Sequence, residues 1–140
     1  MSSSVACIVY KNEKLFIAKR KSIGDMGGKW EFPGGKIENN EDPEIAIKRE
    51  MQEEFGVEAS VGEKIGTANF IHSGKTCVVD AYKVDFAHDG MNIPFVLTEH
   101  TEYKWVNPLE IKQLDFVDSD LKIYKAVVKY LKGLKKHEKN

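Results

Sequence analysis

Three glutamates near the middle of the chain, Glu50, Glu53 and Glu54, are separated by three and four positions. On an α-helix this spacing places side chains on the same face, so the three carboxylates would converge. Like charges on one helix face repel by about 0.2–0.5 kcal/mol per pair, and Arg49 is one cation beside three anions. Carboxylate oxygens are the ligands that Mg²⁺ and Mn²⁺ prefer. The spacing therefore indicates either a divalent metal site or a solvated acidic face.

The segment that must position these glutamates has clear helix boundaries. Asp42 is a good N-cap, whose carboxylate can accept from the free N–H groups of the first turn, and Pro43 suits the first helical position. Gly56 can adopt the positive φ that ends a helix. A rotation of about 100° per residue places three large apolar side chains together on the adjacent face. These are Ile47, Met51 and Phe55.

The same segment resembles the Nudix box, Gly-x5-Glu-x7-Arg-Glu-U-x-Glu-Glu-x-Gly-U, in which U is apolar. Residues 35–57 match every specified position, through Gly35, Glu41, Arg49, Glu50, Met51, Glu53, Glu54, Gly56 and Val57. The preceding residues 30–36, Trp-Glu-Phe-Pro-Gly-Gly-Lys, are similar to those before the box in MutT-type nucleotide pyrophosphohydrolases. The pattern favours the metal site over the solvated acidic face.

The resemblance implies which residues hold the metal. Glu50, Glu53 and Glu54, with the carbonyl of Gly35, are expected to bind Mg²⁺, or alternatively Mn²⁺. Such ions polarise phosphoryl oxygens, lower the pKa of a bound water and orient it for in-line attack. Within the box, Glu53 is the expected base. Arg49 is expected to orient the glutamates.

Two further roles follow from the resemblance. Glu41 is expected to brace the loop before the helix or to help through a further metal. Some family members place the base outside the box, on a later loop or strand, and Glu99 and Glu102 are the candidates here. A charge at a strand edge is the alternative interpretation of both, and it suits Glu99 better. An unaltered turnover number in Glu102→Gln would remove Glu102 from the mechanism.

Substrate-binding residues are predicted outside the box. Arg20 matches a position where MutT-type enzymes hold substrate phosphate, a task that suits its planar guanidinium. Residues 114–121 resemble the segment that brings an Asn or Asp to the nucleobase. Asp120 matches that position best, and Asp118 is nearby. A carboxyl there can accept from a base amine, or donate if protonated, which suits cytosine or an oxidised purine. Helix capping is the other interpretation of both residues.

The remaining elements predict an α/β/α sandwich around a mixed β-sheet, the fold that the resemblance also implies. A turn between the first two strands predicts a hairpin, and residues 72–75 predict another. Asn107 is expected to cap a short helix, and Asp118 or Ser119 to cap a last helix reaching about residue 134. Trp30 is expected to pack rather than to stack on a base. The predicted strands span residues 5–10, 15–18, 30–32, 57–71, 76–86 and 99–106.

Composition limits the other possibilities. The 140 residues, 41% hydrophobic and 31% charged, suit a single globular domain over 1–140. The net charge of −1 gives no global attraction to nucleic acid polymers or anionic membranes. Cys7 and Cys77 are expected to be buried reduced thiols. The four histidines have no zinc-ligand spacing, so a zinc site is not expected. No signal peptide or transmembrane run is seen, so a cytoplasmic protein is expected. The expected oligomeric state is a monomer or a homodimer.

Three functions remain open from the sequence. The first is hydrolysis of a nucleoside or deoxynucleoside triphosphate, canonical or oxidised, to monophosphate and pyrophosphate. The second is Nudix hydrolysis of a diphosphate-linked compound such as ADP-ribose or a dinucleoside polyphosphate. The third is a nucleotide-binding module without catalysis. The compact length and the residues 30–36 favour the first, and the intact box disfavours the third.

Overall fold

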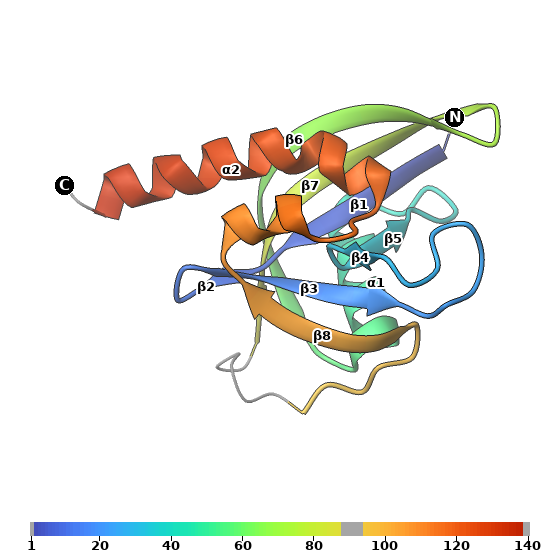
Figure 1. The fold of residues 1–140 in the computed structure, drawn as a ribbon, viewed down its shortest axis with the longest axis horizontal. Coiled ribbons are helices and arrows are strands. Elements are labelled where there is room, and N and C mark those ends of the chain that lie inside the picture. The colour runs from blue at the N-terminus through green and yellow to red at the C-terminus, as the bar shows by residue number, and fades with distance from the viewer. Residues whose placement is uncertain (1, 88–93, 139–140) are drawn as a thin grey trace.

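The computed structural model describes residues 2–87 and 94–138, and Figure 1 shows their arrangement. Strands form both halves of the described chain, and one helix separates them. In chain order the elements are β1 (Ser2–Ile8), β2 (Tyr10–Lys11), β3 (Lys14–Arg20), β4 (Trp30–Glu31), β5 (Gly34–Lys36), α1 (Pro43–Phe55), β6 (Ala59–His72), β7 (Lys75–Phe86), β8 (His100–Val106), the 3₁₀ helix η2 (Pro108–Gln113) and α2 (Asp118–Glu138).

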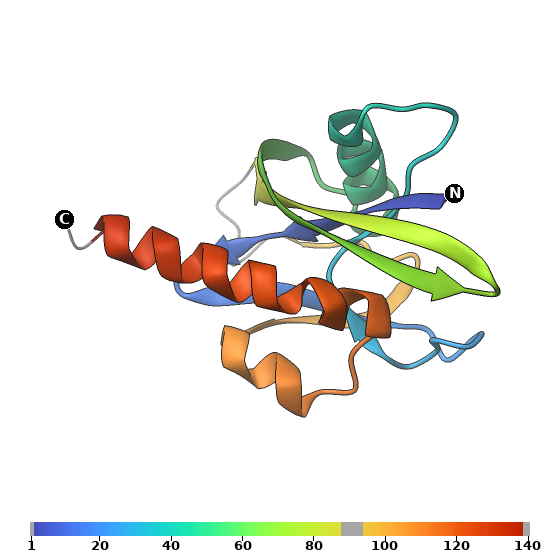
Figure 2. The ribbon, with the colours of Figure 1, turned by 90° about the horizontal axis from the view of Figure 1, so that it is seen from above.

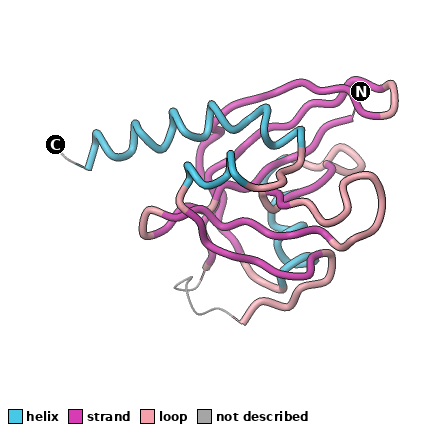
Figure 3. The backbone as a smooth tube through the Cα atoms, viewed as in Figure 1, coloured by secondary structure: helices cyan, strands magenta, loops and turns pink. Residues whose placement is uncertain are grey.

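The strands, drawn in magenta in Figure 3, are the main part of the fold. The described residues form two four-stranded sheets. The first has the order β5-β1-β7-β6, in which β1 runs parallel to β7 and the other pairs are antiparallel. The second is built on β3, which pairs antiparallel with β2, β4 and β8. The predicted mixed sheet is confirmed. The predicted hairpin is wrong in part, because the tight turn joins β2 to β3, whereas β1 pairs with β5 and β7.

The alternation of side chains along β1 builds two separate cores. Val5 and Cys7 pack in the cluster that contains the buried face of α1. Ala6 and Ile8 pack in the cluster that contains Ile123 and other residues of α2. Figure 2 shows α1 and α2 on either side of β1. The α/β/α sandwich is therefore confirmed.

Helix α1 follows its sequence signals with one exception. Its predicted apolar face is fully buried. Gly56 ends the helix with φ of 66°, as predicted, and its N–H donates to the carbonyl of Gln52. Asp42 occupies the N-cap position, but its side chain makes no capping hydrogen bond, so that part of the prediction is wrong. The backbone carbonyl of Asp42 still accepts from the Ala46 N–H at 3.0 Å.

The last two helices begin differently from each other. Asn107 caps η2 as predicted, its side chain accepting from the Leu109 N–H at 2.9 Å. Helix α2 begins at Asp118, so the prediction that Asp118 or Ser119 caps it is wrong. The Val117 carbonyl accepts from the N–H groups of Asp120 and Leu121 instead.

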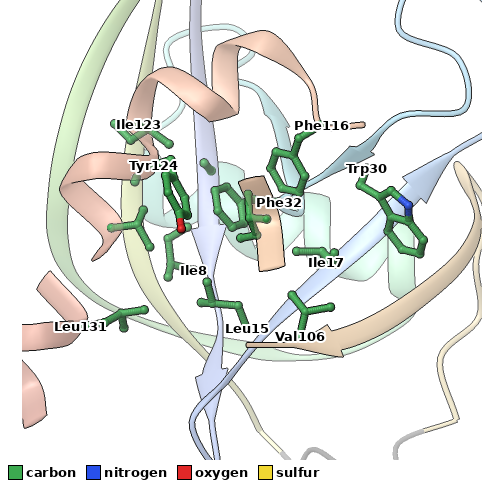
Figure 4. Packing of buried hydrophobic residues seen from close by; sticks show 14 of the residues in the cluster. Ile8, Leu15, Ile17, Trp30, Phe32, Val106, Phe116, Ile123, Tyr124 and Leu131 are labelled. Atoms are coloured by element: carbon green, nitrogen blue, oxygen red, sulfur yellow. The ribbon is translucent and has the colours of Figure 1, made fainter. Parts of the chain in front are cut away.

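The core on the α2 side closes over the strand that precedes the box (Figure 4). Trp30 is 7% exposed and packs in this cluster, so its predicted packing role is confirmed. Cys7 and Cys77 are buried free thiols, also as predicted. Among the described helices, none combines the length and the apolar character needed to cross a membrane.

Candidate active site

Arg49 is the centre of a hydrogen-bond network on the exposed side of α1. Its Nε and Nη2 donate to the two carboxylate oxygens of Glu41, both at 2.8 Å. Its Nη1 donates to Glu50 at 2.7 Å and to Glu53 at 3.2 Å, and Nη2 also reaches the Lys36 carbonyl at 3.0 Å. The hydrogen bonds from Arg49, and next the one from the Glu38 N–H, lower the pKa of Glu41 to about 2. One guanidinium thus joins the loop before α1, strand β5 and two carboxylates of the acidic face.

Gly35 lies directly against the carboxylate of Glu50. A Cβ atom built at Gly35 would lie 2.7 Å from the Glu50 Cδ and equally close to its oxygens. Only glycine permits this approach without displacing the carboxylate. Burial raises the pKa of Glu50, against the opposing effect of Arg49. The structure therefore brings together two of the predicted metal ligands, the backbone of β5 and a side chain of α1.

Glu53 and Glu54 follow each other on α1 but have opposite surroundings. The Glu53 side chain is 61% exposed, whereas Glu54 is only 5% exposed. Burial, followed by the nearby charges of Glu50 and Glu31, raises the pKa of Glu54 to about 9. Among the described residues no lysine or arginine forms an ion pair with Glu54, and its Oε1 has no hydrogen-bond partner. A buried carboxyl with an unsatisfied oxygen is unfavourable unless a cation or proton compensates it.

Two residues that the sequence did not single out complete this region. Glu31 accepts from the Arg20 Nη1 at 3.1 Å through one oxygen and lies 2.8 Å from the His100 Nε2 through the other. The His100 ring is buried and stacks on Phe55, with the ring centroids 5.2 Å apart. Potential ligand atoms of Glu31, Glu54 and His100 all lie within 4.8 Å of one another. Glu31 stands in the segment before the box, but the position of His100 follows only from the β3–β8 pairing.

A cavity of about 990 Å³ lies between β5, the β6–β7 hairpin and the first turn of α2. Arg20, Gly35, Asp118 and Asp120 all line it, so the structure brings the three predicted substrate residues to one cavity. The three glutamates of α1 are not among the described residues that line this cavity. Glu50 contacts Gly35, which is one of the residues that line the cavity.

Asp120 is buried at this cavity and bonded to a distant strand end. Its Oδ2 accepts from the Phe32 N–H at 2.9 Å. Burial, and next the charge of Glu31, raises the pKa of Asp120 to about 8. Capping is therefore not the function of this carboxyl in the structure. Asp118, two residues earlier, is exposed at the rim.

Glu102 lies apart from the carboxylates of α1. It is exposed, and the β3–β8 register places it opposite Lys19. Glu31 pairs with Ala18, the next residue on β3, and successive side chains point to opposite faces of a strand. Glu102 and Glu31 therefore point to opposite faces of the sheet. Its role as the base stays a prediction, and the geometry favours Glu53 for that role.

Carboxylates gathered along one helix, next to a cavity, are typical of metal-dependent enzymes that act on phosphorylated substrates. Residues 2–127 match the NUDIX domain, and the protein belongs to the Nudix hydrolase family. This match covers nearly all the elements that build the cavity and the acidic face.

Named relatives lie within the same family. The chain is 32% identical over 126 residues to a CTP pyrophosphohydrolase of Escherichia coli K12, covering 90% of each protein. It is 54% identical over 50 residues to an 8-oxo-dGTP diphosphatase of Proteus vulgaris, covering 36% of this chain and 45% of that protein. The solution structure of the E. coli ORF135 protein matches with a TM-score of 0.79 at 32% identity, covering 91% of this chain and 89% of the other.

Proposed function

We propose that this protein hydrolyses a nucleoside or deoxynucleoside triphosphate to the monophosphate and pyrophosphate. The observation that carries the proposal is the position of Gly35, which lines the cavity on one side and contacts the Glu50 carboxylate on the other. A nucleotide in the cavity would therefore place its phosphates at the acidic face of α1. Relatives named for CTP and 8-oxo-dGTP support a triphosphate substrate.

The residues of the acidic face fit a divalent cation. Glu50, Glu53 and Glu54, with the carbonyl of Gly35, would supply the oxygen ligands that Mg²⁺ or Mn²⁺ prefers. The unpartnered, buried Oε1 of Glu54 supports this assignment. When bound, the metal neutralises phosphate charge and polarises the phosphoryl oxygen under attack.

The chain's own residues would then orient the reactants. Glu53 is exposed, and Arg49 holds one of its oxygens, which leaves the other available to take a proton from water. Arg49 fixes the neighbouring Glu50 at the same time. Arg20, whose side chain is 42% exposed, would hold a substrate phosphate with its free guanidinium edge.

Base selection is assigned to Asp120. Its pKa of about 8 keeps this carboxyl protonated near neutral pH, so it can donate to the base as well as accept from it. A protonated carboxyl suits a carbonyl acceptor, and an ionised one suits an exocyclic amine. Both cytosine and an oxidised purine offer such groups, and the assay decides between them.

The test is chromatographic identification of all products, together with pyrophosphate release, after incubation with Mg²⁺ of canonical and oxidised nucleoside triphosphates, ADP-ribose and diadenosine polyphosphates. The expected result is pyrophosphate release from one triphosphate that is lost in Glu53→Gln and kept in Glu102→Gln. Activity only on the diphosphate-linked compounds would contradict the proposed substrate class. Nucleotide binding without any product would instead support a binding module.

A further inference from the structure

Three polar side chains from separate strands lie on one face of the second sheet. Glu31 on β4 pairs with Ala18 of β3. His100 on β8 pairs with Arg20 of β3. Residues opposite each other in a sheet point to the same face, and so do residues two apart on one strand. Glu31, Arg20 and His100 therefore share a face, although β3 lies between β4 and β8 (Figure 1).

An irregularity in β8 gives His100 this position. Lys19 of β3 pairs with Glu102 of β8. The next residue of β3, Arg20, pairs with His100, so Thr101 is an extra residue on β8. An extra residue bends its strand and changes the direction of the side chains beyond it. Without it, Arg20 would lie opposite Thr101, and His100 would point to the other face of the sheet.

Hydrogen bonds join the three side chains in a row. The His100 Nε2 lies 2.8 Å from Oε2 of Glu31, and Oε1 of the same carboxylate accepts from the Arg20 Nη1 at 3.1 Å. A carboxylate only accepts hydrogen bonds, so Nε2 is the donor here. We propose that His100 is a positioning residue, which fixes the Glu31 carboxylate so that this carboxylate fixes the Arg20 guanidinium at the cavity. The inference rests on the proposed function, in which Arg20 holds a substrate phosphate.

The guanidinium of Arg20 depends on Glu31 for its orientation. The Arg20 side chain is 42% exposed, and Glu31 is its one ion-pair partner within residues 2–87 and 94–138. Its Nε is buried and has no hydrogen-bond partner among the same residues. A long side chain that becomes ordered only on binding loses rotamer entropy, which weakens the binding. A fixed carboxylate orders this arginine before the substrate arrives.

His100 can fix Glu31 because it is itself held in place. It is 3% exposed, and its ring stacks on Phe55 of α1 with 5.2 Å between the centroids and 13° between the planes. Just before β8, the Thr98 hydroxyl donates to the Glu53 carbonyl at 2.7 Å, which attaches this part of the chain to the same helix. The imidazole is therefore a donor of fixed orientation at the end of the row.

The experiment is a double-mutant cycle on the full chain with Mg²⁺. It measures the Kd of the α,β-methylene analogues of CTP and dGTP, which cannot be cleaved between the first two phosphates. Arg20→Ala should weaken binding about 10- to 100-fold, because hydrogen bonds to a charged group are lost. His100→Leu should weaken it about three- to tenfold, and equally for both bases, because the effect acts on the phosphates. In the Arg20→Ala background, His100→Leu should change the Kd by less than about twofold.

Two control variants separate positioning from packing. His100→Leu and His100→Gln both lose the ring that stacks on Phe55, but only glutamine can still donate to Glu31. His100→Gln should therefore bind both analogues within about twofold of wild type. Thr98→Val loses the bond to α1 and keeps the contact between His100 and Glu31, so any effect it has should remain in full in the Arg20→Ala background.

Side-chain NMR tests the same relationship without nucleotide. By ¹⁵N relaxation, the Arg20 Nε–H group should be as rigid in His100→Gln as in wild type and more mobile in His100→Leu. If His100→Leu does not fold, His100→Asn replaces it, because the shorter side chain places its amide near the position of Nδ1, away from Glu31.

Two results would overturn the positioning role. One is equal mobility of Arg20 in wild type and in the variant that cannot donate to Glu31. The other is an effect of His100→Leu on Kd that is just as large in the Arg20→Ala background, which would mean that His100 only supports the fold. Wild-type protein that binds neither analogue would instead contradict the proposed function, and the NMR comparison would still decide whether His100 positions Arg20.

Discussion

The guanidinium of Arg49 and the carboxylate of Glu41 face each other in a two-point hydrogen bond, with both N–O distances at 2.8 Å. The remaining nitrogen, Nη1, donates to Glu50 at 2.7 Å. The orientation of the Glu50 carboxylate is therefore coupled to the loop that carries Glu41. This coupling needs a planar, forked donor, which lysine does not provide.

Replacing Arg49 with lysine should lower kcat more than it raises KM. An ammonium cannot hold Glu41 and Glu50 together, and a displacement of about 1 Å in a catalytic group can reduce the rate by about 10²-fold. Steady-state kinetics on the best substrate of the panel measures the effect. Lys48→Gln is the matched control, because Lys48 is exposed and its Nζ lies 3.8 Å from the Glu44 carboxylate. A wild-type kcat in Arg49→Lys would show that the network does not orient the glutamates.

Replacing Gly35 with alanine should impair activity while the fold is kept. The added Cβ would meet the end of the Glu50 side chain at 2.7 Å, and a side-chain end can move away at small energetic expense. The carboxylate would then leave its position, and we expect a loss of kcat on the order of 10²-fold. Thermal unfolding and kinetics are measured together. Gly133→Ala, which meets nothing within 4 Å in α2, should change neither activity nor binding.

The boundaries of α1 and its buried face could be predicted because they depend on local features. Helix periodicity and the glycine that ends the helix are visible in neighbouring residues. The partner of β1 could not be predicted, because an apolar strand has the same pattern whichever strand it pairs with. In the structure, β1 packs apolar side chains on both faces and lies between β5 and β7.

The parts of the site that the sequence missed depend on long-range pairing. The contact between Glu31 and His100 spans 69 residues, and that between Phe32 and Asp120 spans 88. No spacing rule within one element relates such residues. The short β3–β8 pairing, with its irregularity between Lys19 and Arg20, places His100 next to Arg20 and Glu31. A single inserted residue in β8 would place another side chain there.

Asp120 should make stability depend on pH in the metal-free protein. Its pKa is about 8 in the folded state and near its ordinary value of 3.8 when unfolded. Between these values the folded state keeps a proton that the unfolded state releases. The free energy of unfolding therefore falls as pH rises from about 4 to 8, by at most about 1.4 kcal/mol per pH unit for this group.

Urea unfolding at several pH values with a chelator measures this dependence. Asp120→Asn keeps an acceptor for the Phe32 N–H but has no proton to lose, so its stability should fall less steeply with pH. Asp118→Asn is the matched control, since Asp118 is exposed on the same helix turn and should leave the slope as it is. Equal slopes in wild type and Asp120→Asn would contradict the raised pKa.

Divalent metal should stabilise the protein through Glu54. A ligand that binds only the folded state adds about 2.7 kcal/mol to the free energy of unfolding at 100 times its Kd. Glu54→Gln keeps the shape of a buried, uncharged carboxyl but removes a negatively charged ligand. In the presence of a chelator, the variant and the wild type should have similar unfolding temperatures. Added Mn²⁺ should raise the unfolding temperature of the variant far less than that of the wild type. If Mn²⁺ raised the unfolding temperature of Glu54→Gln as much as that of the wild type, Glu54 would be excluded from metal binding.

Asp120 should also decide between bases. Its carboxyl lines the cavity and is held by Phe32, so a base in the cavity would meet a hydrogen-bonding group of fixed orientation. Asp120→Ala should raise KM about 10-fold or more for the preferred triphosphate, because a lost hydrogen bond to a buried partner removes about 1–3 kcal/mol. The KM for triphosphates with other bases should change less. Asp118→Ala, at the exposed rim, should not change the order of kcat/KM among the triphosphates. Comparing kcat/KM across the panel for both variants measures selectivity directly. An equal loss for every base would mean that Asp120 supports the strand end at Phe32 and does not contact the base.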